Sequence, residues 1–179
     1  QEFRIKEKGY INRNKLINFK FNGKNYTGYE GDTLASALLA NGIHLVGRSF
    51  KYHRPRGIIG AGVEEPNAQV QLYSGSKTEP NAIATTIELV EGLVAKSQNC
   101  WPSVSFDFGA INNFLSKFFP AGFYYKTFKW PKSFWYKVYE PFIRKIAGFG
   151  IASLEKDKER YEHKYEYCDL LVTGSGPAG

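Results

Sequence analysis

A glycine-rich turn near residue 179 is the pattern in this sequence with the clearest chemistry. It follows the short apolar run Cys168–Val172 and has the spacing GxGxxG; its members are Gly174, Ser175, Gly176, Pro177, Ala178 and Gly179. In such a turn the first glycine permits the tight bend, the second lets the backbone approach a pyrophosphate, and the third allows a following helix to pack closely. We therefore interpret residues 168–172 as a strand and residues 174–179 as a cofactor-binding turn; an ordinary glycine-rich turn is the alternative.

The remaining parts of such a nucleotide site would follow Gly179. They are the helix whose N-terminus supplies N–H groups to the phosphates, a second strand, and an acidic residue for the ribose about 20 residues further on. We therefore expect residues 168–179 to be the truncated start of a Rossmann-type α/β domain that does not hold a dinucleotide by itself.

A basic and aromatic loop over residues 48–57 is the second candidate site. Its polar candidates are Arg48, Lys51, His53, Arg54 and Arg56, and Phe50 and Tyr52 lie between them. Guanidinium and ammonium groups bind phosphates and carboxylates, so we expect the loop to contact a phosphate or another subunit. A solvated basic loop that pairs with Glu64 and Glu65 is the alternative.

Residues that could ligate a metal are scattered along the chain. The two cysteines, Cys100 and Cys168, are far apart, and His44 and His163 have no other ligand-type residue beside them. This distribution predicts neither a metal site nor a disulfide framework.

Charge and hydropathy restrict the partners only in part. Twenty-four Lys and Arg against seventeen Asp and Glu give a net charge of +7, which favours anionic partners without choosing among nucleotides, acidic proteins, nucleic acid and lipid headgroups. No run approaches the roughly 20 apolar residues of a membrane-spanning helix, and the polar residues 1–8 lack the apolar run of a secretion signal. We expect a cytoplasmic protein.

The elements that would position these residues begin with a hairpin and a helix. Residues Leu16–Tyr29 alternate apolar and polar side chains around Asn22-Gly23, whose residue types suit the positive φ of a tight turn. Asp32 or Thr33 can then cap a helix that ends at Asn41-Gly42. Two strands followed by a helix predict the opening of a β-grasp fold.

The later elements are less regular. We expect a loop over residues 47–66 and a strand over residues 68–73. Residues 85–90 and 93–95 could pair around Glu91-Gly92, although a helix over residues 84–97 fits the same apolar positions. The charge-rich residues 154–167 are typical of a solvated helix or a linker that enters the next domain.

Residues 101–150 are aromatic-rich and interrupted by prolines. All three Trp lie there, together with Pro102, Pro120, Pro131 and Pro141. The pattern predicts short helices and turns that pack on a neighbouring part of the protein. Because rings beside cations also suit bases and lipid headgroups, residues 118–144 leave nucleic-acid and membrane-surface binding as alternatives.

Most of the sequence resembles one family, the alpha subunit of heterotetrameric sarcosine oxidase. Residues from about Ile17 to Gly179 resemble the N-terminal portion of that subunit. The resemblance ends with the CDLLV strand and the GxGPAG turn. Its carriers are GDTLASALLANG (31–42), RSFKYHRPRG (48–57), EPNA (65–68), SQN (97–99), WPS (101–103), YKTF (125–128), WP (130–131), YEP (139–141) and IR (143–144).

The resemblance implies a fold and an activity. In that family the complete enzyme oxidatively demethylates sarcosine, tetrahydrofolate accepts the one-carbon unit and oxygen accepts the electrons. The alpha subunit binds NAD and shares an FMN site with the beta subunit, and the gamma and delta subunits complete the heterotetramer. Residues 1–100 would be a β-grasp, 2Fe-2S ferredoxin-like domain that has lost its cluster, residues 101–167 an aromatic connecting segment, and residues 168–179 the start of the dinucleotide-binding domain, an α+β arrangement overall.

The sequence agrees with a lost cluster, because a plant-type 2Fe-2S site needs four cysteines with a C-x4-C-x2-C core and the loop 47–62 contains none. Of the family's functional residues, the resemblance places only the glycine-rich turn on this chain, and no catalytic residue for amine oxidation is evident. Two other functions remain open: a basic, aromatic-rich module that binds an anionic polymer such as nucleic acid, and a subunit of a related amine or amino-acid dehydrogenase.

Overall fold

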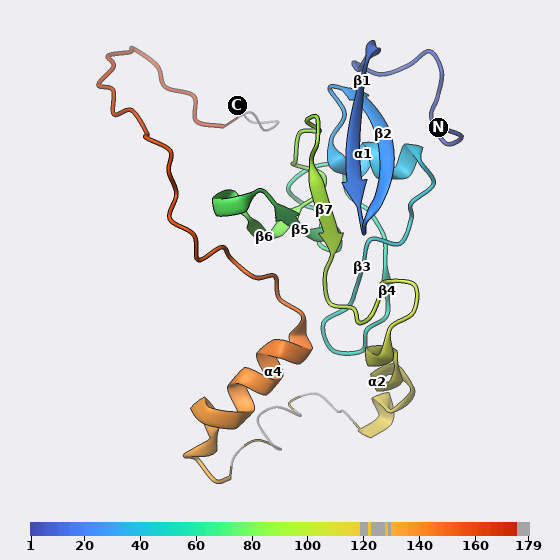
Figure 1. Ribbon diagram of the computed structural model, residues 1–179, viewed down its shortest axis with the longest axis vertical. Coiled ribbons are helices and arrows are strands. Elements are labelled where there is room, and N and C mark those ends of the chain that lie inside the picture. Colours follow the sequence, from blue (N-terminus) through green and yellow to red (C-terminus); the bar gives the residue numbers. More distant parts are fainter. Residues whose placement is uncertain (119–121, 123–127, 129, 175–179) are drawn as a thin grey trace.

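The computed structural model describes residues 1–118, 122, 128 and 130–174. Figure 1 shows a twisted sheet, helical segments beside and below it, and a long extended segment toward the C-terminus. The strands are β1 (Asn12–Phe21), β2 (Lys24–Glu30), β3 (Gly47–Arg48), β4 (Pro55–Arg56), β5 (Gln69–Tyr73), β6 (Glu79–Ile83) and β7 (Val94–Ser97). The helical segments are α1 (Leu34–Ala40), η1 (Gly75–Lys77), η2 (Phe108–Ala110), α2 (Ile111–Phe114), η3 (Ser116–Phe118), the π-helix η4 (Trp135–Tyr139) and α4 (Glu140–Ala147).

The predicted hairpin is confirmed. Strands β1 and β2 pair antiparallel up to Phe21 and Lys24, and the turn between them has φ of 51° at Asn22 and 79° at Gly23. Positive φ at both central residues is the backbone of a tight hairpin turn, which Asn-Gly adopts readily. The alternation along β1 buries Ile17, Phe19 and Phe21 on one face of the sheet.

The predicted helix is confirmed, and Thr33 is its cap. The Thr33 hydroxyl accepts from Ser36 N at 3.2 Å, and the Ser36 hydroxyl accepts from Thr33 N at 3.0 Å, which satisfies two backbone donors at the helix start. Asp32 is used differently: its buried carboxylate receives both terminal nitrogens of Arg4, at 3.0 and 2.6 Å. At the other end Gly42 has φ of 76° and ends the helix.

The main sheet is mixed and has the order β2-β1-β7-β5-β6. Strand β7 lies parallel to β1, while the other neighbours are antiparallel. Helix α1 lies behind the β1–β2 hairpin (Figure 1), and its buried face joins the apolar side chains of the sheet in one core. A hairpin, a helix and a later strand parallel to the first constitute the predicted β-grasp arrangement.

Two later predictions are wrong in detail. Residues 84–90 form neither a strand nor a helix, because their backbone bonds the start of α1: Leu34 N donates to Ile87 O at 2.8 Å, and Leu89 N donates to Asp32 O at 2.9 Å. Strand β5 pairs with β7 on one side and with β6 on the other, and β6 was not predicted because a proline stands at its second position. The loop 47–66 also contains a short ladder between β3 and β4.

Short helices and turns after residue 100 are confirmed in the part of the chain that the structure describes. The segment after α4 then returns to the sheet, where the buried side chain of Gln71 bonds both backbone groups of Ile151: Ile151 N donates to Oε1 at 2.8 Å, and Nε2 donates to Ile151 O at 3.1 Å. A side chain at Gly150 would bring its Cβ within 2.4 Å of Gln71 Oε1, so glycine permits this approach. Beyond it, residues 154–167 are extended and exposed, as a linker rather than a helix.

Candidate functional site

The structure divides the basic loop 48–57 into an inner and an outer part. Arg48 points inward, where Nε donates to Val104 O at 2.8 Å, Nη1 to His53 O at 3.0 Å and Nη2 to Ser105 O at 3.3 Å. Each of the three guanidinium nitrogens thus donates to a different backbone carbonyl group. Arg48 therefore joins the loop to the segment 104–105 and is not directed at a phosphate in solution.

His53 also points inward and forms a buried pair with Asp107. Its Nδ1 lies 2.7 Å from Oδ2 of Asp107, and Arg48 Nε lies 3.8 Å from the same oxygen. The other carboxylate oxygen accepts from Trp101 N at 3.0 Å and from Gly109 N at 3.1 Å. Because a carboxylate oxygen accepts hydrogen bonds, the geometry suits an N–H on Nδ1 of His53 that donates to Asp107.

A hollow of about 710 Å³ lies beside this pair. His53, Gln98, Asn99 and Cys100 are among its lining residues. In the described part of the chain, three buried side-chain atoms have no hydrogen-bond partner, and all three belong to this lining: His53 Nε2, Gln98 Oε1 and Asn99 Oδ1. Buried polar atoms usually find partners, so the hollow suits a group that donates N–H or O–H bonds.

Covalent catalysis through Cys100 is not favoured in this hollow. Burial raises the pKa of the Cys100 thiol, and the charge of Asp107 raises it further. A raised pKa keeps the sulfur as a thiol, whereas the thiolate is the nucleophile. The arrangement of Arg48, His53 and Asp107 can hold the loop 48–57 in a fixed orientation on the segment 101–109, which is distant from it in sequence.

The outer part of the loop carries its remaining cations. Lys51 Nζ lies 4.9 Å from the centroid of the Tyr52 ring, and the guanidinium carbon of Arg54 lies 4.8 Å from it. Arg54 Nε also donates to Asn113 Oδ1 at 2.7 Å, and Arg56 is exposed in β4. Loop and short helix α2 thus form one basic and aromatic surface, which can meet an anionic group.

The alternative in which this loop pairs with Glu64 and Glu65 is wrong. Glu64 accepts from the backbone N–H groups of Ala61 and Gly62 at 2.8 and 2.9 Å. The Glu65 carboxylate is buried and also accepts backbone N–H groups. Local backbone donors therefore compete successfully with the arginines for both carboxylates.

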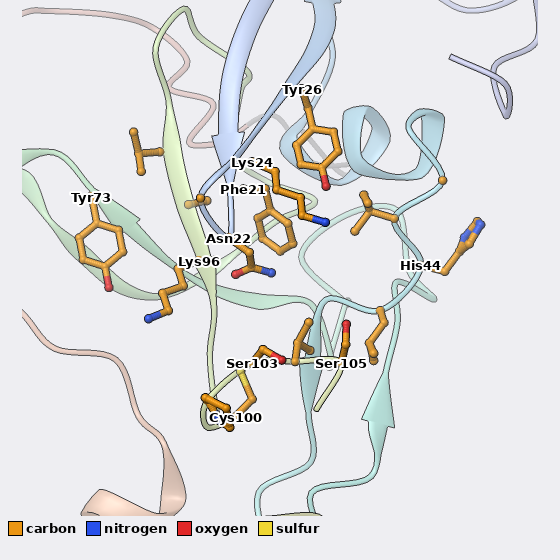
Figure 2. Close-up of a pocket in the computed structure, with 18 residues that line it drawn as sticks. Phe21, Asn22, Lys24, Tyr26, His44, Tyr73, Lys96, Cys100, Ser103 and Ser105 are labelled. Atoms are coloured by element: carbon orange, nitrogen blue, oxygen red, sulfur yellow. The ribbon is translucent and has the colours of Figure 1, made fainter. Parts of the chain in front are cut away.

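A second hollow, of about 790 Å³, opens at the β1–β2 turn. Figure 2 shows Asn22 and Lys24 of this hairpin on one side, and the loop that carries Cys100, Ser103 and Ser105 on another. Lys24, Lys96 and His44 give its lining a basic character. The three buried atoms without partners all belong to other residues of the described chain, so this hollow is the weaker candidate.

The glycine-rich turn is described only at its first residue. Gly174 has φ of 97°, while Ser175, Gly176, Pro177, Ala178 and Gly179 lie outside the described residues. The predicted strand 168–172 is not formed, and Leu170, Leu171 and Val172 are exposed by 81, 76 and 57%. A strand needs a neighbouring strand to satisfy its backbone, and the described residues place none beside this segment.

Sequence reasoning misses Asp107, Gln98 and Asn99 as polar members of the hollow. Asp107 lies 54 residues from His53, in an aromatic run without any local signal. Within the described residues no group of three or more His, Cys, Asp or Glu is placed to hold a metal ion. No described helix has the length and apolarity that crossing a membrane requires.

Comparison with known proteins identifies relatives of the whole chain. Residues 14–100 match the family described as "2Fe-2S iron-sulfur cluster binding domain". Sarcosine oxidase subunit alpha of Rhizobium meliloti (strain 1021) is 58% identical over 177 residues, which cover 99% of this chain and 18% of that protein. The subunit of the same name from Corynebacterium sp. (strain U-96) is 28% identical over 172 residues, which cover 94% of this chain and 13% of the relative.

A solved structure, that of L-proline dehydrogenase from P. horikoshii, is similar over 49% of this chain and 16% of its own, with 27% sequence identity and a TM-score of 0.37. The chain spans less than a fifth of the length of the curated relatives. The mixed sheet lies almost entirely within residues 14–100, which match the 2Fe-2S ferredoxin-like family. Because the 58% identity extends over nearly all of its residues, the chain is homologous to a segment of the sarcosine oxidase alpha subunits.

Proposed function

We propose that the chain is the leading segment of the alpha subunit of a sarcosine oxidase. The complete complex would oxidatively demethylate sarcosine, with tetrahydrofolate accepting the one-carbon unit and oxygen accepting the electrons. The observation that carries the proposal is the identity of 58% over 99% of the chain to a protein of that name. The substrate, the cofactors and the beta, gamma and delta partner subunits belong to the proposal, as does a cytoplasmic location.

In this proposal the chain divides into three parts. Residues 1–100 support the complex, residues 101–167 connect, and residues 168–179 begin a Rossmann-type domain that binds NAD in the complete subunit. The positive φ of Gly174 supports the turn, because glycine adopts this conformation readily and the first glycine of such a motif permits a tight bend.

The basic and aromatic surface is the proposed contact with an FMN phosphate or a partner subunit. Lys51, Arg54 and Arg56 would make that contact, while Arg48 and His53 would fix the loop from within. The cations of Lys51 and Arg54 lie 4.9 and 4.8 Å from the centroid of the Tyr52 ring, which supports a surface arranged before binding.

Oxygen consumption by the complete complex tests the substrate. We expect turnover with sarcosine, and formation of a one-carbon adduct when tetrahydrofolate is added. L-Proline and other secondary amino acids serve as controls in the same assay. Turnover of L-proline in place of sarcosine would replace this proposal by the related amino-acid dehydrogenase.

Flavin retention by the complex tests the basic surface. We expect Arg54→Ala to lower the FMN content or the yield of assembled complex, and Lys158→Ala, which removes a cation of the exposed segment 154–167, to change neither. Equal flavin content and equal assembly in both variants would remove the proposed role of Arg54.

Gel-shift measurements with single-stranded DNA at low and high salt test the alternative function, a module that binds an anionic polymer. Phosphate contacts depend steeply on salt, so such a module would bind the DNA at low salt and release it at high salt.

A further inference from the structure

The loop that follows β4 wraps its backbone around one carboxylate. Glu65 accepts four backbone N–H groups: Ile59 N at 2.7 Å and Gly60 N on Oε2, and Asn67 N at 2.7 Å and Ala68 N at 3.2 Å on Oε1. The residue is 2% exposed. Burying a charged group costs free energy unless hydrogen bonds or an opposite charge compensate for the lost water. Here four backbone N–H groups of the loop itself provide that compensation.

The protonation of Glu65 follows from this geometry. Burial alone raises the pKa of its carboxyl group, but the backbone donors Gly60, Asn67, Ile59 and Ala68 outweigh burial and lower the pKa below its ordinary value. Hydrogen bonds from N–H groups favour the ionised form. At neutral pH the loop therefore encloses a negative charge.

Glu65 and two of its donors, Gly60 and Ala68, have the spacing of a known cluster-binding motif. Gly60 lies five residues before Glu65 and Ala68 lies three after it, so the three positions have the spacing of the C-x4-C-x2-C core of a plant-type 2Fe-2S site. The family matched over residues 14–100 is described as binding such a cluster. This chain has only Cys100 in that range, so four thiolate ligands are not available and the residues do not fit a cluster.

We propose that the Glu65 carboxylate is the anion that this loop holds in the place of an iron–sulfur cluster. Concave arrangements of backbone N–H groups bind anions, including phosphates and iron–sulfur clusters. This loop keeps the N–H groups and supplies the anion from its own side chain. Gly60 stands at the first cysteine position, Glu65 at the second and Ala68 at the third.

Two further contacts close the loop around this charge. Thr85 Oγ1, at the turn after β6, donates to Gly62 O at 2.6 Å and joins the loop to the sheet. A Cβ at position 60 would lie 3.1 Å from Glu65 Cα and 3.2 Å from Glu65 N, so the backbone is drawn tightly over the carboxylate. The loop is thereby fixed without a metal, which lets it position the neighbouring basic surface.

Iron analysis gives the first test, and it does not depend on the proposed enzyme activity. The full chain is incubated anaerobically with ferrous iron, sulfide and thiol, then desalted and measured for iron, acid-labile sulfide and visible absorbance. We expect no retained iron or sulfide and no charge-transfer absorbance. Two irons and two sulfides per chain would overturn the proposal.

Amide hydrogen exchange gives the second test. In the wild-type protein we expect slow exchange at Ile59, Gly60, Asn67 and Ala68. In Glu65→Gln we expect exchange at these four amides to become roughly tenfold faster or more, since an amide side chain offers one acceptor oxygen instead of two. The matched control Glu64→Gln should affect only the amides of Ala61 and Gly62.

Fast exchange of the four amides in the wild-type protein would overturn the proposal without any variant. So would unchanged exchange in folded Glu65→Gln. If that variant does not fold, the wild-type exchange and the iron analysis still decide. Failure of the sarcosine assay would leave both readouts intact, so the two proposals can fail separately.

Discussion

His53 Nδ1 lies 2.7 Å from Asp107 Oδ2, and this contact joins two segments that are 54 residues apart. The pair fixes the loop 48–57 on the chain that follows the sheet. Asp107→Ala would leave His53 Nδ1 and the amides of Trp101 and Gly109 without their acceptor. We expect the free energy of unfolding to fall by about 3 kcal/mol, because buried donors would lose their partner.

Urea denaturation measures this change. Asp157→Ala is the control, because Asp157 also accepts a backbone N–H and a hydroxyl but lies in the exposed linker. We expect its unfolding midpoint to equal that of the wild type. Equal midpoints for both variants would show that the buried pair does not stabilise the fold.

The Arg4–Asp32 ion pair should stabilise the domain more than an exposed pair does. Arg4→Met removes both guanidinium contacts and leaves the Asp32 carboxylate buried without its cation. We expect a loss of about 3 kcal/mol in the free energy of unfolding. Lys15→Met breaks the exposed pair with Glu30 and should leave thermal unfolding nearly unchanged. A smaller effect of Arg4→Met than of Lys15→Met would contradict this ranking.

Glu65 should make stability depend on pH in the acid range. Its pKa in the folded state lies below the ordinary value of 4.5. Because the folded pKa is depressed, the contribution of Glu65 is fully present above the ordinary value and is lost as the pH falls through the folded one. We expect the wild type to lose more stability than Glu65→Gln between neutral pH and pH of about 3. Parallel stability curves for the two proteins would exclude this linkage.

The two cysteines should differ in their rates of alkylation. Cys168 is exposed, whereas Cys100 is partly buried and has a raised pKa through burial and the charge of Asp107. Iodoacetamide at pH of about 8 should therefore modify Cys168 at least roughly tenfold faster than Cys100. Peptide mapping by mass spectrometry gives the two rates, and urea should make them equal. Faster reaction at Cys100 in the folded protein would refute the assignment.

Sequence reasoning succeeded where the signal was local. Asn22-Gly23 determines the hairpin turn through its backbone preference, and Thr33 with Ser36 determines the helix start through reciprocal hydrogen bonds. Strand β6 was missed because Pro80 and Asn81 disfavour a strand, while the pairing with β5 overrides that preference. The secondary structure of these residues depends on tertiary contacts, which a short window of sequence does not contain.

The candidate site shows the same division. The charges of the basic loop are evident in the sequence, but their directions are not, since Arg48 turns inward and Arg54 lies outside. Glu65, one of the two acidic partners that the alternative interpretation assigned to the loop, accepts backbone N–H groups within its own loop instead. Composition identifies which groups are charged, whereas the folded backbone decides which partner each one meets.

The contact between Gln71 and Ile151 limits how far from the sheet the residues that follow Ile151 can lie. Ile151 is held at the sheet by two hydrogen bonds, and Cys168 is the seventeenth residue after it (168 − 151 = 17). A fully extended chain spans at most about 3.6 Å per residue, so a tether of this length reaches no further than about 60 Å. The proposed nucleotide-binding domain, which would start at Cys168, must therefore lie within that distance of the sheet.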